Sequence, residues 1–147
     1  MEEKIREILD RILPAKGMEL VDLEIHPNGR SPLVRIFIDR LGGVTVRDCS
    51  EVAREISIHF QVEESIPDTA LLEVSSPGIE RPFKTQRDYE RNLNRKIEVR
   101  YKADNRVLTT EGVLTSVSAE KISVETKSGA LELPLNLILM ARQQLSF

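Results

Sequence analysis

The sequence contains no tryptophan, a single cysteine and few aromatic side chains. Because one thiol cannot form an internal disulfide, Cys49 fits a chain that works in a reducing compartment. Aromatic residues make up 4% of the 147 residues, so any core must consist mainly of Leu, Ile and Val. No apolar run approaches the roughly 20 residues of a membrane-spanning helix, and the charged, amphipathic amino terminus is unlike a secretion signal. These absences predict a cytoplasmic protein without a membrane segment.

Sequence motifs of enzymes are also lacking. The chain contains neither G-x-x-x-x-G-K-[ST] nor G-x-G-x-x-G nor G-x-S-x-G. His26 and His59 are the two histidines of the sequence, and neither has a Cys or His partner at metal-ligand spacing. Cys49 falls on the apolar stripe of a predicted helix, which is typical of a packing residue rather than a catalytic thiol. We therefore expect no catalytic residues, no bound metal and no cofactor.

Charge is divided unevenly along the chain, although the net charge is −3. Residues 1–80 carry 9 Lys and Arg against 16 Asp and Glu, a net charge of −7, whereas residues 81–147 carry 12 against 8, a net charge of +4. Opposite signs favour two domains with different partners. The alternative for the acidic half is that its charge serves solubility alone.

Hydrophobic periodicity predicts an α-β-β-α-β order for the amino-terminal half. Apolar side chains at helical spacing predict a helix over residues 2–13. Residues 21–25 and 33–39 alternate between apolar and polar side chains around a Pro-Asn-Gly-Arg-Ser turn, which predicts a β-hairpin. Thr45, with Asp48 three residues later, predicts the start of a second helix, although Asp suits a capping box less well than Glu.

The most specific pattern of the sequence is LLEVSSPGIERPF at residues 71–83. Residues 71–75 alternate as a strand. Pro77 keeps the preceding residue extended, and Gly78 can adopt the positive φ of a Pro-Gly turn. Pro82 restricts the backbone where the chain leaves this turn. We interpret this segment as a short junction that restricts the orientation of two domains. The residues assigned to the junction are Ser75, Ser76, Pro77, Gly78, Arg81 and Pro82.

This SSPG-(apolar)-(acidic)-RP segment resembles the signature of the bacterial ribosome maturation factor RimP family, with residues 73–82 matching apart from the variable Ile79. The resemblance implies an N-terminal domain similar to the prokaryotic-type KH fold and a C-terminal SH3-like or Sm-like small β-barrel. It also implies binding to the small ribosomal subunit or its precursor, through rRNA and a basic small-subunit protein near the decoding site. A KH domain grips RNA through a G-x-x-G loop. This sequence has none, so KH-type RNA binding is not transferred to it.

Beyond the junction, Thr85 and Asp88 predict a capped short helix over residues 85–93. Strands are predicted over residues 96–101, 111–117, 121–126, 130–134 and 138–142. Their short, regular spacing is typical of a small closed barrel, in which Gly112 marks a sharp bend rather than a ligand contact. The predicted fold class is α+β. Its predicted parts are an N-terminal α/β domain (1–76), a junction (77–84) and a C-terminal small β-barrel (85–147).

Basic residues gather after the junction, with nine Lys and Arg against four Asp and Glu in residues 81–106. Arg87 and Arg91 are four residues apart, so we expect both on one exposed face of the short helix. Tyr89 and Tyr101 lie between the cations and could contact a base or ribose. The alternative is a solvated charged face without a ligand. The candidate rRNA contacts are Arg81, Lys84, Arg87, Arg91, Arg95 and Lys96.

The resemblance of the junction segment to the RimP family implies a monomeric, non-enzymatic assembly factor that binds the small ribosomal subunit and acts by binding energy, without nucleotide hydrolysis. A general RNA-binding protein or translational regulator is the first alternative, and it would use the basic residues on free RNA. A small hydrolase is the second alternative, and it would have to show turnover.

Overall fold

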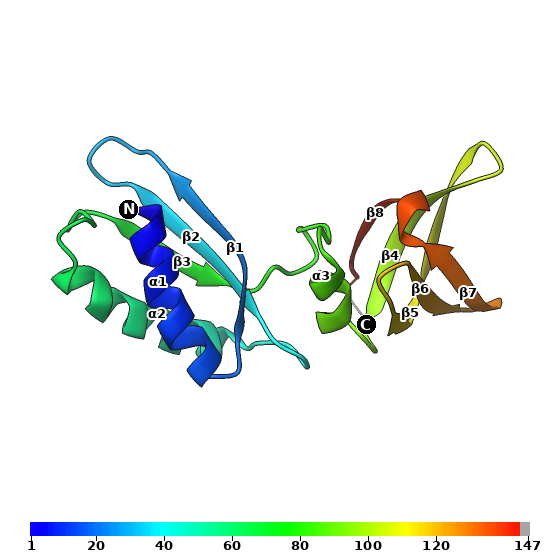
Figure 1. Cartoon of the computed structure of the whole chain (residues 1–147), viewed down its shortest axis with the longest axis horizontal. Coiled ribbons are helices and arrows are strands. Elements are labelled where there is room, and N and C mark those ends of the chain that lie inside the picture. Colours follow the sequence, from blue (N-terminus) through cyan, green and yellow to red (C-terminus); the bar gives the residue numbers. More distant parts are fainter. Residues whose placement is uncertain (145–147) are drawn as a thin grey trace. The chain divides into compact units, whose positions relative to one another are not determined.

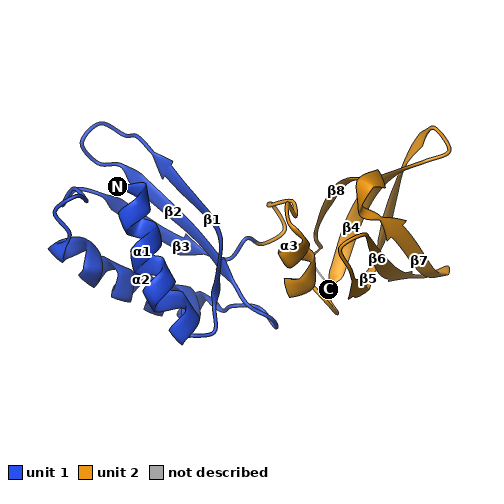
Figure 2. Cartoon of the chain, viewed as in Figure 1, with its two compact units in different colours: residues 1–77 blue, residues 78–147 orange. Residues whose placement is uncertain are grey.

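The computed structural model describes residues 1–144, and the chain divides into two compact units, residues 1–77 and 78–147 (Figure 2). The predicted C-terminal domain ends at residue 147, so its last three residues lie outside the described part. The first unit has the predicted α-β-β-α-β order. Its elements are α1 (Glu2–Ala15), β1 (Glu19–His26), β2 (Leu33–Asp39), α2 (Val46–Val62) and β3 (Leu71–Ser75). Within residues 1–144, no helix is long and apolar enough to cross a membrane.

The first unit is a three-stranded sheet with both helices on one face (Figure 1). β1 and β2 are antiparallel, and β3 returns after α2 to lie parallel to β2 at the sheet edge. Alternation places one set of strand side chains against the helices. The core is almost wholly aliphatic, as the composition predicts. Its fully buried side chains are Ile5, Leu9, Val34, Ile36, Ile38, Val52 and Ile56.

Helix α2 begins at the predicted capping box. The Thr45 side chain accepts a hydrogen bond from the Asp48 amide at 3.0 Å, and the Asp48 carboxylate accepts one from the Thr45 amide at 2.9 Å. These hydrogen bonds satisfy two amide groups that the helix itself leaves unpaired. They also lower the pKa of Asp48, chiefly through the backbone hydrogen bond from Thr45. Asp therefore completes this capping box as Glu would.

Two details of the first unit differ from the prediction. The inward alternation of β1 starts at Leu20, opposite Ile38, and not at Val21, because a β-bulge lies between Leu20 and Asp22. A bulge inserts one extra residue and shifts the alternation. Helix α1 also continues to Ala15 through Pro14. A proline in the last turn removes one helical hydrogen bond but does not prevent that turn from closing.

The second unit joins a short helix to a five-stranded antiparallel sheet. Its elements are α3 (Gln86–Arg91), β4 (Lys96–Ala103), β5 (Arg106–Val117), β6 (Lys121–Thr126), β7 (Gly129–Pro134), η1 (Leu135–Leu137) and β8 (Ile138–Gln143). The strand order is β7-β6-β5-β4-β8. All five predicted strands are therefore present. The strand pairs of the described residues include none between β7 and β8, so the predicted closure into a barrel is not confirmed.

Strand β5 begins five residues earlier than predicted and forms a long hairpin with β4. Ala103 pairs with Arg106, which leaves a two-residue turn at Asp104 and Asn105. These two residues have φ angles of 50° and 63°. Positive φ at both central positions is the mark of a type I′ turn, which matches the twist of the two strands. The Asp-Asn pair is the signal for this turn in the sequence, because Asp and Asn tolerate positive φ angles better than most residues.

Gly112 lies where two strands approach each other closely. A Cβ atom on this residue would lie 2.3 Å from the carbonyl oxygen of Glu125 and 2.7 Å from a methyl group of Val124. Both residues belong to β6. The glycine therefore allows β5 and β6 to approach, a reason that the sequence analysis did not foresee, and the bend predicted at this residue stays a prediction.

Gly78 has a φ angle of 59°, as the Pro-Gly turn predicts. A Cβ atom there would meet no heavy atom within 4 Å, so the cost of a side chain comes from the backbone alone. We expect Gly78→Ala to lower the free energy of unfolding by about 1 kcal/mol. Gly78→Asn should cost less, because Asn tolerates positive φ. Thermal unfolding of the two variants measures the difference. Equal stability of Gly78→Ala and the wild type would contradict the strained conformation.

Candidate functional site

The segment that carries the predicted rRNA contacts is organised around Asp88. This carboxylate accepts hydrogen bonds from the amide groups of Lys84 and Thr85, at 2.8 and 3.1 Å. The Thr85 hydroxyl accepts one from the Asp88 amide at 3.1 Å, which completes the predicted capping box of α3. The Asn92 side chain closes the other end of the helix by donating to the Asp88 carbonyl at 2.7 Å. Asp88 therefore fixes the short helix at both ends.

Arg91 is buried, which contradicts the predicted exposed face of α3. Its side chain is 5% exposed, and its guanidinium donates to the Asp88 carboxylate, whose side chain is 11% exposed. The reason lies beyond the helix: the Asn94 amide donates to the Leu114 carbonyl of β5 at 2.7 Å and draws the last turn onto the sheet. Arg91 is therefore part of the structure of this unit and is not available to a phosphate group.

Tyr89 is also buried, so it cannot offer its ring to a base. Its ring packs edge to face on Phe83, with centroids 5.0 Å apart and an angle of 73° between the planes. Such pairs stabilise a fold beyond the area that they bury. Burial of the hydroxyl raises the pKa of Tyr89 to about 12, and the Asp88 carboxylate adds to this shift. Tyr89 thus anchors α3 to the core of the second unit.

The raised pKa of Tyr89 predicts a loss of stability in alkali. In the unfolded chain tyrosine ionises near pH 10. The neutral side chain therefore contributes its full stability below about pH 10, and this contribution is lost as the pH rises towards about 12. We expect the free energy of unfolding of the wild type to fall across this interval more steeply than that of Tyr89→Phe. Urea unfolding at several alkaline pH values tests this. Parallel pH profiles of the two chains would contradict it.

The other predicted contacts are less buried than Arg91. Arg87 is exposed and pairs with Glu90 at 3.1 Å, and Arg95 donates to Asn92 at 3.0 Å. Lys84 is exposed, while Arg81 and Lys96 are half-buried. Their role as rRNA contacts stays a prediction, as does the role of the junction residues in orienting the two units.

Three further cations lie on the β4–β5 hairpin, outside the predicted set. Arg100, Lys102 and Arg106 are all exposed. None of them has an ion-pair partner among residues 1–144, in contrast to Arg87 and Arg91. All three belong to the basic segment of residues 81–106, but the sequence does not single them out, because only the hairpin brings them together.

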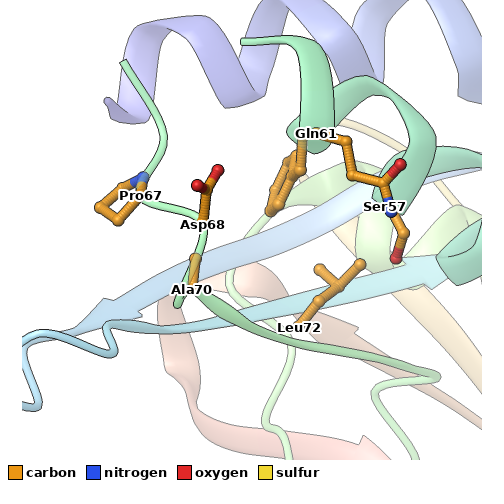
Figure 3. Close-up of a pocket in the computed structure, with 7 residues that line it drawn as sticks. Ser57, Gln61, Pro67, Asp68, Ala70 and Leu72 are labelled. Carbon is orange, nitrogen blue, oxygen red and sulfur yellow. The ribbon is translucent and has the colours of Figure 1, made fainter. Parts of the chain in front are cut away.

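The first unit contains an open pocket of about 440 Å³ between the end of α2 and β3 (Figure 3). Its lining residues are Ser57, Phe60, Gln61, Pro67, Asp68, Ala70 and Leu72. The Ser57 hydroxyl donates to the Ala53 carbonyl at 2.9 Å. The lining offers one carboxylate, that of Asp68, and neither histidine nor cysteine, so it contains no Ser-His or Cys-His pair of the kind used in nucleophilic catalysis.

Cys49 and His26 of the first unit lie in different environments. Burial raises the pKa of Cys49, which keeps its thiol protonated in the core. His26 is exposed and lies 3.0 Å from Glu24. In the part of the chain that the structure describes, no group of three or more His, Cys, Asp and Glu side chains is placed to hold a metal ion.

Comparison with known protein families gives a match that covers most of the first unit. The model of the RimP N-terminal domain matches residues 8–80. These residues run from α1 through the three-stranded sheet to the Ser-Ser-Pro-Gly turn. The match therefore includes most of the segment whose sequence resembles the family signature, and the chain belongs to the RimP family of ribosome maturation factors.

Proposed function

We propose that the protein is a non-enzymatic assembly factor that binds the small ribosomal subunit, or its precursor, and promotes its maturation in the cytoplasm. The observation that carries this proposal is the match of residues 8–80 to the RimP N-terminal domain. The burial of Cys49 and the hydrogen bond that engages the Ser57 hydroxyl support action by binding alone. In this proposal the protein acts as a monomer, without a cofactor.

The proposal extends to the two folds. Residues 1–76 would be similar to the prokaryotic-type KH fold, and their α-β-β-α-β order supports this. Residues 85–147 would form an SH3-like small barrel, which five antiparallel strands with a 3₁₀ turn between β7 and β8 support. Residues 77–84 would be the junction between them.

The proposed partners follow the division of charge. The acidic first unit would face a basic small-subunit protein near the decoding site, and the basic second unit would face rRNA. On β1, the residues Glu19, Asp22 and Glu24 pair with the β2 residues that point away from the helices, so their carboxylates share one face of the sheet. Charge complementarity of this kind speeds encounter and suppresses wrong partners.

Sedimentation through a sucrose gradient tests the proposed function. We expect the protein to migrate with free small subunits and not with complete ribosomes. Binding to both in proportion to their amounts, or to neither at low salt, would contradict the proposal. Strong, salt-sensitive binding to naked RNA without migration on small subunits would favour a general RNA-binding protein or translational regulator instead.

A further inference from the structure

The β4–β5 hairpin forms a narrow ribbon that extends beyond the rest of the second sheet. β4 and β5 pair over eight positions, from Lys96 with Val113 to Ala103 with Arg106. The neighbouring strands cover only part of this length, because β6 pairs with β5 from Val113 onwards and β8 reaches β4 only as far as Tyr101. The end of the ribbon, in yellow, therefore projects from the sheet (Figure 1).

Three cations surround the end of this ribbon. Arg100 and Lys102 are two residues apart on β4, so they lie on the same face. Arg106 pairs with Ala103 and lies on the other face, directly after the turn. All three are exposed, and no ion pair engages them in the described part of the chain. A ribbon that presents unpaired cations on both faces is suited to a chain of phosphates.

An open groove of about 600 Å³ lies between this ribbon and the segment from β7 to η1. Its floor is mainly apolar and includes the half-buried ring of Tyr101. The other apolar lining residues are Ala103, Leu131, Leu133, Pro134 and Leu137. An apolar floor with one aromatic ring suits a flat, neutral group better than a phosphate.

The polar groups of the groove favour a base that donates hydrogen bonds. Asp104 and Glu132 line it with carboxylates, Asn105 adds an amide, and Lys102 lines it from the ribbon. Glu132 also pairs with Lys121 at 3.2 Å. Carboxylates repel phosphate but accept hydrogen bonds from an exocyclic amino group, as in the readout of cytosine. The groove and the ribbon thus offer adjoining places for the two chemical parts of one nucleotide chain, with Lys102 bordering both.

We propose that a single-stranded segment of RNA binds along the β4–β5 ribbon, with its phosphates on Arg100, Lys102 and Arg106 and one unstacked base in the groove against Tyr101. The inference rests on the proposed function, since it assigns the rRNA contact to particular residues. It moves this contact from α3, where Arg91 is buried, to the exposed hairpin.

The first test measures binding of the full chain to fluorescent oligo(C) and oligo(U) about twelve nucleotides long. We expect tighter binding of oligo(C), and three phosphate contacts should give a log–log salt slope of about 2. Arg100→Gln/Lys102→Gln/Arg106→Gln should remove most of this slope. The matched control, Arg11→Gln/Arg30→Gln/Arg54→Gln, removes the same charge from exposed positions of the first unit and should bind as the wild type.

Tyr101→Leu and Tyr101→Phe separate stacking from charge. Loss of the ring should weaken oligo(C) binding at least about fivefold, whereas Tyr101→Phe should retain it. Unfolding curves show that each variant is folded before its affinity is compared. Equal binding of oligo(C) and oligo(U), or equal binding by Tyr101→Leu and the wild type, would overturn the placement of a base in the groove.

Sedimentation with small subunits distinguishes failure of this inference from failure of the proposed function. If the wild type and the ribbon variant migrate with small subunits equally well and with the same salt dependence, the ribbon is not the RNA contact and the proposed function stands. If the wild type binds oligo(C) through the ribbon but never migrates with small subunits, the proposed function fails and the RNA site stands. Weaker migration of the ribbon variant than of the charge-matched control supports both.

Discussion

Arg91→Glu is expected to destabilise the second unit by about 3–5 kcal/mol, because it removes one partner of a buried ion pair and leaves the other uncompensated. Asp88 and Arg91 are 8% and 4% exposed, so water can solvate neither charge well. The new carboxylate would also lie one helical turn from Asp88, where like charges repel. Repulsion of the Asp88 carboxylate would in addition weaken the hydrogen bonds that it accepts from the amides of Lys84 and Thr85.

The matched control is Arg87→Glu, the same substitution one turn earlier on the same helix. Arg87 is exposed, and its ion pair with Glu90 lies in water. Exposed pairs contribute about 0–1 kcal/mol, so this variant should stay close to the wild type. Asp88→Asn/Arg91→Leu, which removes both buried charges and keeps an acceptor at the cap, should be more stable than Arg91→Glu.

Tyrosine fluorescence gives a measurement specific to the second unit. The chain has no tryptophan, and both tyrosines, Tyr89 and Tyr101, follow residue 78. Urea unfolding followed by this signal therefore reports the second unit, while circular dichroism reports both units. An Arg91→Glu chain with the unfolding free energy of the wild type would contradict the buried pair.

Gly112→Ala is the second substitution with a large expected effect, a loss of about 1–3 kcal/mol through overpacking. The added methyl group would lie 2.3 Å from the Glu125 carbonyl oxygen, which is a backbone atom and cannot rotate away. β5 is also held on its other side, where Gly112 pairs with Ile97 of β4. Relief of the overlap would therefore require two paired strands to separate.

Gly112→Val should be more destabilising than Gly112→Ala, because two further methyl groups enter the same gap. Thr109→Ala, at an exposed position of the same strand, is the control and should change the unfolding midpoint little. Gly112→Ala with an unchanged midpoint would show that β5 and β6 are farther apart at this position than 2.3 Å implies.

The sequence predicts this fold well where the pattern is local. Alternation located β3 and β6 at their observed bounds, and the Thr-x-x-Asp pattern located the starts of α2 and α3, because caps and alternation depend on neighbouring residues. The β4–β5 turn was missed although its signal is equally local. The strand after it begins with Arg106, whose charge hides the alternation.

The candidate site could not be predicted as well, because exposure depends on tertiary contacts. Arg87 and Arg91 have the same residue type and helical spacing, and the sequence gives no reason to separate them. The difference in exposure between them depends on a tertiary contact, in which the Asn94 amide donates a hydrogen bond to the carbonyl of Leu114 in β5. For the same reason the sequence could not show that Tyr89 packs on Phe83 while Tyr101 lines a groove.

Both units are completed by their last strand, and this has a consequence for the synthesis of the chain. In the first unit, β3 pairs with β2 although all of α2 lies between them in the sequence. In the second unit, β8 pairs with β4, which is the first strand of that sheet along the chain. Pairings between distant segments form late, because the intervening chain must first be made and then ordered. The first unit can close only when Ser75 has left the ribosome, and the second only when Gln143, the last residue of β8, has left it. Until then, the nascent chain exposes open strand edges, so early truncation should yield an aggregating product rather than a smaller folded one.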